Sequence, residues 1–208
     1  MHKSLVVVED FYTNPMEVRN AALSVGFPEH RGPRTFPGRN SAQPLLIPNL
    51  DRAISGLVGE PLRAQDSATS FHGYCRSTLA GEESRYLVHV DPSNLVWVGV
   101  CYLSLPEDCS GGTTFYRHRG LGLDRTPTQQ AEIEAVGVPG IAELLARDGR
   151  DPKVWEELMT VPMRFNRAIF YRPWLWHSAG PGFGDRAENG RMVQVFSFVS
   201  AEPSNQGA

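Results

Sequence analysis

The stretch from Tyr86 to Leu105, YLVHVDPSNLVWVGVCYLSL, contains two runs that are rich in Val, Leu, Tyr and Trp. A polar segment, Asp-Pro-Ser-Asn, separates the two runs. β-Branched and aromatic residues favour strands, whereas Pro, Asp, Ser and Asn favour turns. The stretch therefore predicts a strand at Tyr86–Val90, a turn, and a second strand at Leu95–Leu105.

Other parts of the chain have the same composition and the same turn residues at their ends. They are Ser67–Thr78, Thr113–Tyr116, Ala168–Tyr171 and Arg191–Ser200. Several short strands bounded in this way are typical of an antiparallel sandwich or barrel. We therefore expect a mainly β core.

Helices are expected on the N-terminal side of this core. A short strand at Leu5–Val8 is followed by Asn14-Pro15, a helix start, and then by apolar residues at helical spacing as far as Gly26. A second helix is predicted at Leu50–Val58. Residues 28–48 are rich in Pro, Gly and Arg and predict a long loop. The sequence thus predicts a mainly β protein with flanking helices.

A helical insertion is predicted between two of the expected strands. Apolar residues at helical spacing in Thr128–Arg147 and in Pro152–Met159 indicate two helices, which we expect to cover the mouth of a barrel. We expect a single domain with three parts. These are an N-terminal helical support at 1–66, a β core at 67–116 and 163–201, and a helical insertion at 117–162.

Composition restricts the class of protein. The chain has 208 residues, of which 41% are hydrophobic and 21% are charged, with a formal net charge of -3. These values are typical of a globular protein and give no basic surface for nucleic acid. Cys75, Cys101 and Cys109 lack the spacing of a zinc site or a disulfide framework, and no stretch approaches the roughly 20 apolar residues of a membrane span. We therefore expect a cytoplasmic protein with neither a nucleic-acid nor a membrane partner.

Three residues have the chemistry of a metal site. His89 and Asp91 lie two positions apart on a predicted strand, so both side chains face the same way, and His177 follows far downstream. Two imidazoles and one carboxylate on one side of an iron(II) ion leave positions open for an oxo-acid and O2. A His-x-Asp pair by itself is more often a surface or capping feature, so the surrounding segments decide the interpretation.

Four segments in a fixed order supply that context. They are Tyr86–Asp91, then Val100–Ser104 with Ser110–Phe115, then Phe165–Tyr171 with His177-Ser178-Ala179, and last Arg191–Phe198. Over roughly residues 71–200 they resemble the prolyl-hydroxylase-like branch of the 2-oxoglutarate/Fe(II) oxygenases. The resemblance implies a double-stranded β-helix (jelly-roll) barrel, Fe(II) held by His89, Asp91 and His177, and 2-oxoglutarate and O2 as cosubstrates. It also implies hydroxylation of an unactivated C–H bond with release of succinate and CO2.

An arginine is the expected partner of the cosubstrate. A buried dicarboxylate needs a cation, and a guanidinium pairs with a carboxylate through two hydrogen bonds. Arg191 opens the last predicted strand and shares one face with Val193 and Val195. Arg186 lies closer to His177 in the sequence, but within a turn-rich segment. The resemblance implies that Tyr102 adds a phenol hydrogen bond to the same carboxylate.

Further polar and aromatic residues are candidates for binding the substrate, although surface or packing roles are also open to each of them. They are Tyr74, Arg76, Arg117, His118, Arg172 and Trp174. Together they predict a polar substrate with a carboxylate, such as an amino acid, a peptide or a related small metabolite. Two alternatives remain at this point. One is a cupin-like metal-dependent oxygenase or isomerase that does not use 2-oxoglutarate, and the other is a barrel that binds without catalysis.

Overall fold

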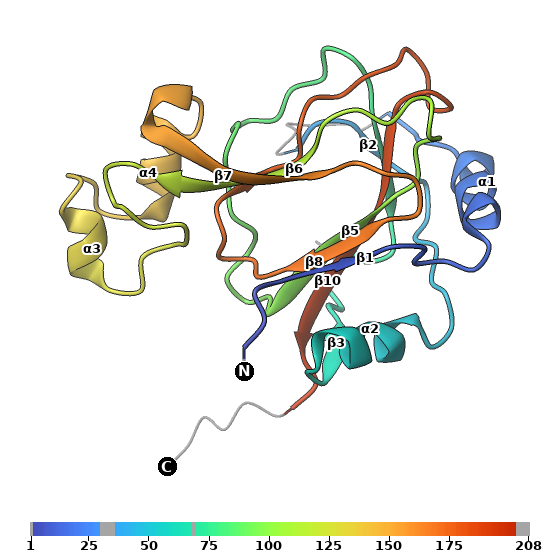
Figure 1. Ribbon diagram of the computed structural model, residues 1–208, viewed down its shortest axis with the longest axis horizontal. Helices are drawn as coiled ribbons and strands as arrows, with labels where there is room; N and C mark the ends of the chain where they lie inside the picture. The colour runs from blue at the N-terminus through green and yellow to red at the C-terminus, as the bar shows by residue number, and fades with distance from the viewer. Residues whose placement is uncertain (1, 30–35, 68–69, 203–208) are drawn as a thin grey trace.

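The computed structural model describes residues 2–29, 36–67 and 70–202, and two antiparallel sheets dominate this part of the chain (Figure 1). The larger sheet has the order β1-β8-β5-β10-β4-β2, with β3 pairing to β10. Its strands are β1 (Leu5–Val8), β8 (Ala168–Tyr171), β5 (Trp97–Tyr102), β10 (Arg191–Ser200), β4 (Cys75–Thr78), β2 (Arg39–Asn40) and β3 (Leu62–Ala64). The smaller sheet consists of β7 (Trp155–Pro162), β6 (Gly112–His118) and β9 (His177–Ser178). The mainly β prediction is confirmed.

The space between the two sheets holds one hydrophobic core. Its buried members come from strands of both sheets and from the adjoining Leu95 and Met163, and they are Leu95, Val98, Tyr102, Phe115, Val161, Met163, Ile169, Tyr171 and Val193. Directly opposed residues of antiparallel strands point to the same side of a sheet. Val193 of β10 lies opposite both Tyr102 of β5 and Arg76 of β4. These side chains therefore share the inner face of the larger sheet.

The outer face of the larger sheet is covered by α1 (Pro15–Val25) and α2 (Leu50–Val58), which begin and end where the sequence predicts. Ala22 of α1 and Ile54 of α2 are fully buried against this sheet. Phe196 of β10 belongs to the same outer core, because alternate residues of a strand point to opposite faces. The helices thus cover the outer face of the sheet and leave its inner face to pack against the smaller sheet and to line a cavity.

The insertion contains less helix than the sequence predicts. It has α3 (Gln130–Glu134) and α4 (Ile141–Asp148), which in Figure 1 lie at one end of the smaller sheet. The predicted helix at Pro152–Met159 is wrong, because a 3-10 turn at Pro152–Val154 leads directly into β7. β7 is an edge strand with a mostly exposed middle, so it lacks the alternating pattern that marks a strand. Its pairing with β6 holds it extended.

The ligand segment is also different from the prediction. Tyr86–Val90 is not a strand: of these residues only His89 makes a β-bridge, and it is an isolated one to His177. Instead, the backbone N–H groups of Leu87 and Val88 both donate to the carbonyl of Gly149, at 2.8 and 3.1 Å. The segment therefore lies against the C-terminal end of α4.

The β core draws on all three predicted parts of the chain. Strands β1, β2 and β3 fall within residues 1–66, and β7 falls within residues 117–162. The predicted strand Ser67–Thr78 is reduced to β4 within the described residues. No helix in the described part of the chain has the length and apolar character needed to cross a bilayer.

Candidate metal and cosubstrate site

The backbones of the two candidate histidine ligands are joined directly. The N–H of His89 donates to the carbonyl of His177 at 2.9 Å, and the N–H of His177 donates back to the carbonyl of His89 at 3.0 Å. In such a hydrogen-bonded antiparallel pair both side chains point to the same side. The N–H of Asp91 donates to the carbonyl of Pro173 at 3.0 Å, which anchors the third residue beside them.

The three side chains converge as one metal site requires. Ligand atoms of His89, Asp91 and His177 all lie within 4.8 Å of one another, and His177 Nε2 is 3.3 Å from an oxygen of Asp91. His177 Nδ1 lies 2.9 Å from the carbonyl oxygen of Leu175. A carbonyl can only accept, so Nδ1 carries the proton and Nε2 presents its lone pair. This second contact orients the ring in the way that metal-binding histidines usually require.

Burial shifts the pKa values of two of the candidate ligands. Burial, with His177 and Arg76 nearby, holds the pKa of His89 well below its usual value, so this imidazole is neutral and able to bind a metal. Burial raises the pKa of Asp91, although His177 and Arg76 act in the opposite direction. It is costly to keep a buried carboxylate charged without a partner. A bound cation therefore strongly stabilises the charged form of Asp91. The donor set and its electrostatics therefore fit a divalent transition metal.

A small cavity of about 100 Å³ extends from the three ligands to Arg191. Arg191 is buried, with 4% of its surface exposed, and its Nε atom has no hydrogen-bond partner. Within residues 2–29, 36–67 and 70–202, no carboxylate forms an ion pair with it. A buried guanidinium without a counter-charge is costly, and burial lowers its pKa. The unpaired cation at the end of this cavity fits the distal carboxylate of 2-oxoglutarate.

Two hydroxyl groups from opposite sheets also line this small cavity. Thr113 of β6 lies 2.8 Å, oxygen to oxygen, from the phenol of Tyr102. Tyr171 of β8 packs its ring against His177, with centroids 4.7 Å apart. Burial raises the pKa of Tyr171 well above its usual value, so its hydroxyl stays protonated and can donate a hydrogen bond to an anion. Tyr102 itself does not line the cavity, and it contacts this space through Thr113.

Arg186, the alternative cosubstrate partner, is elsewhere. Its side chain is 64% exposed and pairs with Asp185 at 3.0 Å in the turn before β10. Arg191 opens β10, as the sequence predicts, and lies opposite Thr78 on β4. The structure therefore places Arg191, and not Arg186, beside the candidate metal ligands.

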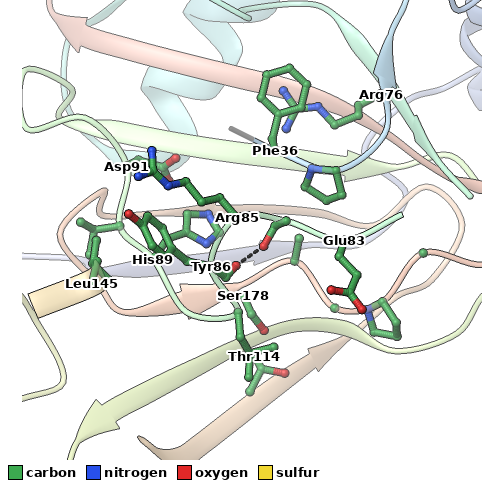
Figure 2. Close-up of a pocket in the computed structure, with 18 of the residues that line it drawn as sticks. Phe36, Arg76, Glu83, Arg85, Tyr86, His89, Asp91, Thr114, Leu145 and Ser178 are labelled. Atoms are coloured by element: carbon green, nitrogen blue, oxygen red, sulfur yellow. Dashed lines mark hydrogen bonds between the residues drawn. The ribbon is translucent and has the colours of Figure 1, made fainter. Parts of the chain in front are cut away.

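A second, larger cavity of about 1050 Å³ is also lined by His89 and Asp91 (Figure 2). Its wall includes Leu145 of α4 and Tyr86 of the ligand segment, together with Phe36 from the long N-terminal loop. The insertion thus contributes to the wall of this cavity, and its role as a cover over the barrel stays a prediction. The two cavities together give the candidate metal site one narrow and one wide approach.

Of the predicted substrate-binding residues, Arg76 alone lines these cavities within the described parts of the chain. Arg117 is exposed and pairs with Glu156. Arg172 pairs with Glu60 and stacks on Trp97 at 4.3 Å. The structure does not bring the remaining members to the site either.

Those remaining members have other surroundings. His118 is buried and lies 2.9 Å from Asp148 of α4. Trp174 is 39% exposed. Tyr74 is half-buried, with its ring 6.4 Å from that of Phe71. Each has a contact or exposure that accounts for it without a ligand.

Sequence reasoning did not single out Thr113 and Tyr171 as functional residues. Thr113 follows the Gly111-Gly112 turn, and Tyr171 ends a strand that reads as ordinary core. The sequence offers one signal for Tyr171: it follows Ile169 by two residues, on the same face of a predicted strand, and precedes His177 by six positions. Knowing which face points inward required the register of the sheet.

Solved structures share this fold. The non-heme alpha-ketoglutarate-dependent carbocyclase SnoK from nogalamycin biosynthesis superposes with a TM-score of 0.58 at 15% identity, over 97% of this chain and 81% of that one. HygX from Streptomyces hygroscopicus, with nickel and 2-oxoglutarate bound, gives 0.54 at 14% identity, over 96% and 84%. At this identity the likeness shows the fold, which is the double-stranded β-helix of 2-oxoglutarate oxygenases. The prolyl-hydroxylase-like branch stays a prediction.

The sequence itself places the chain in a family. The model of the family described as "Family of unknown function (DUF6445)" matches residues 1–193, and the chain belongs to that family. No curated protein matches the chain.

Proposed function

We propose that this protein is a 2-oxoglutarate- and Fe(II)-dependent oxygenase that hydroxylates an unactivated C–H bond of an amino acid, a peptide or a related small metabolite. One observation supports this most directly. The His89, Asp91 and His177 cluster shares a small cavity with the buried guanidinium of Arg191, which has no carboxylate partner in the described part of the chain. A metal site alone would not need that cation, and a dicarboxylate cosubstrate does.

The residues divide the work by position. His89, Asp91 and His177 would hold the ion from one side and leave its other positions open. Arg191 would pair with the distal carboxylate of 2-oxoglutarate, and the hydroxyl of Tyr171 would donate to the cosubstrate within the small cavity. When bound, Fe(II) and 2-oxoglutarate supply the activation of O2, with succinate and CO2 as by-products.

The large cavity would hold the substrate. It reaches His89 and Asp91, so a carbon bound there lies next to the metal positions that the protein leaves open. Its walls include Leu95 and Val195, which limit water around the reacting atoms. The protein thus contributes binding, orientation and exclusion of water.

The test is a coupled assay on the whole chain, with Arg186→Gln as a matched arginine control. Under anaerobic conditions, Fe(II) plus 2-oxoglutarate should produce a weak visible absorption band. After O2 is admitted, succinate should form together with O2 uptake. Arg191→Gln should lose both signals at moderate 2-oxoglutarate concentrations, whereas Arg186→Gln should keep them.

The same assay separates the alternatives. A cupin-like enzyme that does not use 2-oxoglutarate would bind the metal and form no succinate. A non-catalytic barrel would give neither O2 uptake nor succinate. Either result with correctly folded, metal-loaded protein would reject the proposal.

A further inference from the structure

Arg76 occupies the boundary between the two cavities. It lies on β4 opposite Val193 of β10, so its side chain points to the inner face of the larger sheet. It lines both the small cavity, which reaches Arg191, and the large cavity beside Asp91. A cation at this boundary faces the metal site from the substrate side.

Asn40 and Phe36 fix the position of the Arg76 guanidinium. Its Nε donates to Asn40 Oδ1 at 2.8 Å, and its central carbon lies 3.6 Å from the centroid of the Phe36 ring (Figure 2). A second ring, that of Phe71, lies 5.4 Å away. Stacking on aromatic faces fixes the plane of a guanidinium and leaves its terminal N–H groups free to bind. Arg76 is therefore positioned in advance of any ligand.

Within the described residues, the terminal N–H groups of Arg76 have no carboxylate partner. Among the residues that the structure describes, none forms an ion pair with Arg76, and its hydrogen bond to Asn40 uses Nε alone. Burial and the nearby Arg191 lower the pKa of Arg76 to about 10, so the group is still charged at neutral pH. The site therefore contains two cations without a carboxylate partner among the described residues: Arg191, which is buried, and Arg76, which is half-buried.

The proposed cofactors account for only one of them. The charges of Fe(II) and Arg191 together balance those of the Asp91 carboxylate and the two carboxylates of 2-oxoglutarate. Arg76 then remains as one uncompensated positive charge in the wall shared by the two cavities. A partly buried charge without a counter-charge has a cost, and a bound anion removes that cost.

Other charges that line the large cavity are less suited to pair with Arg76. Arg150 and Glu83 pair with each other at 2.6 Å, with side chains 62% and 75% exposed. Glu82 accepts a hydrogen bond from the backbone N–H of Leu79 at 2.8 Å. Arg85 and Glu157 are exposed to solvent. Water therefore screens the charges of Glu83, Arg85, Arg150 and Glu157.

On the basis of the proposed function, we infer that Arg76 binds the carboxylate of the substrate. The oxygenase would accordingly select a substrate with one carboxylate close to the carbon that is oxidised. The rest of such a molecule would lie in the large cavity against Tyr86, Tyr116 and Leu145. Arg76 would be the residue that determines this specificity.

The test compares acids with their neutral amides. The whole chain is loaded with Ni(II), which holds 2-oxoglutarate without turnover, and then with 2-oxoglutarate. Calorimetry measures the affinity of two probe pairs, phenylacetate with phenylacetamide and hexanoate with hexanamide. We expect at least one acid to bind tenfold or more tightly than its amide, because only the acid can pair with a guanidinium.

Three variants test whether Arg76 causes the preference for the acid over the amide. Arg76→Gln should reduce the difference between acid and amide to less than threefold, and Arg76→Lys should restore part of it because the charge is kept. Arg85→Gln is the matched control: it removes an arginine from the wall of the same cavity, and the preference should persist. The affinity for 2-oxoglutarate should change less in Arg76→Gln than the affinity for the acid.

The outcomes are distinct. If the loaded wild-type protein shows no acid preference in either pair, the inference is overturned and the proposed function stands. If Arg76→Gln loses 2-oxoglutarate as strongly as the acid, Arg76 serves the cosubstrate and the inference is again overturned. If the wild-type protein retains no 2-oxoglutarate with Ni(II), the proposed function fails, and the inference fails with it. The acid preference is measured on the wild-type protein, so it can overturn the inference even if a variant misfolds.

Discussion

Two of the histidine–aspartate pairs in the described part of the chain differ in their surroundings. His177 Nε2 is 3.3 Å from Asp91, and His118 Nε2 is 2.9 Å from Asp148. Beside the first pair stands another imidazole, His89, whose ring centroid is 4.3 Å from that of His177. Asp91 lines both cavities and His177 lines the small one, whereas neither member of the second pair lines either cavity.

The surroundings of the second pair explain its role. His118 Nδ1 accepts a hydrogen bond from the N–H of Leu121 at 3.1 Å, and both oxygens of Asp148 accept from Arg147 at 2.7 Å. The indole of Trp155 donates to the carbonyl of Asp148 at 2.9 Å. This cluster is fully satisfied and connects β6 to α4. A histidine beside a carboxylate thus indicates a metal site only where their ligand atoms are not already used in hydrogen bonds within the protein.

The largest expected effect comes from exchanging one carboxylate in each pair. Asp91→Asn removes the anionic ligand, so succinate formation should fall by more than roughly a hundredfold, since even changes behind the ligands cost about 10–100-fold. Asp148→Asn should retain most of the wild-type rate. Succinate release at saturating Fe(II) measures both. Equal losses in the two variants would contradict the distinction between the pairs.

The next largest effect is expected from replacing Arg191, the proposed partner of the distal carboxylate of 2-oxoglutarate. Arg191→Met should raise the KM for 2-oxoglutarate by about 30-fold or more, because truncating one partner of a buried charge pair costs on the order of 2–5 kcal/mol. Without cosubstrate, the same variant should be at least as stable as wild type, because it removes an unpaired buried charge.

Thermal unfolding with and without 2-oxoglutarate measures the second part of that prediction. A matched control is Arg186→Gln, which removes an exposed arginine from the turn before β10. A marked loss of stability in cosubstrate-free Arg191→Met would show that the guanidinium has a partner in the protein.

A smaller effect is expected on stability at the second pair. Asp148→Asn weakens the bonds from Arg147 and His118 to a buried carboxylate, which should cost about 1–3 kcal/mol. For a chain of this size the Tm should fall by roughly 3–10 °C. Scanning calorimetry measures it, and Asp185→Asn, at an exposed carboxylate, serves as the control with little change.

The smallest effect is a dependence on pH. Hydrogen bonds from Arg147, and then from His118, hold the pKa of Asp148 below its usual value. The resulting stability is present above the unfolded pKa of about 3.9 and is lost as the pH falls through the lower folded pKa. The difference in unfolding free energy between wild type and Asp148→Asn should therefore shrink below about pH 4. Urea unfolding at a series of pH values measures it, and a constant difference would contradict the assignment.

Much of the fold could be predicted because the signals are local. Pro15 and Gly26 bound α1, and the apolar run Arg191–Ser200 is β10 with the predicted ends. The predictions fail where long-range pairing decides the conformation. β7 has a mostly exposed, non-alternating sequence and is a strand because β6 pairs with it. The ligand segment has the composition of a strand, yet it makes only one isolated bridge.

The sequence by itself determined the β class and predicted the candidate ligands and two candidate cosubstrate arginines, Arg191 and Arg186, because residue chemistry and spacing are written along the chain. Only the tertiary structure decided which polar residues face a cavity. Arg76 and His118 look alike as candidates in the sequence, yet one lines both cavities and the other is bonded to Asp148. The physical reason is that the register of the sheet sets the direction of each side chain, and α4 supplies the partner that occupies His118. Both the register and this partner depend on contacts between residues that are distant in the sequence.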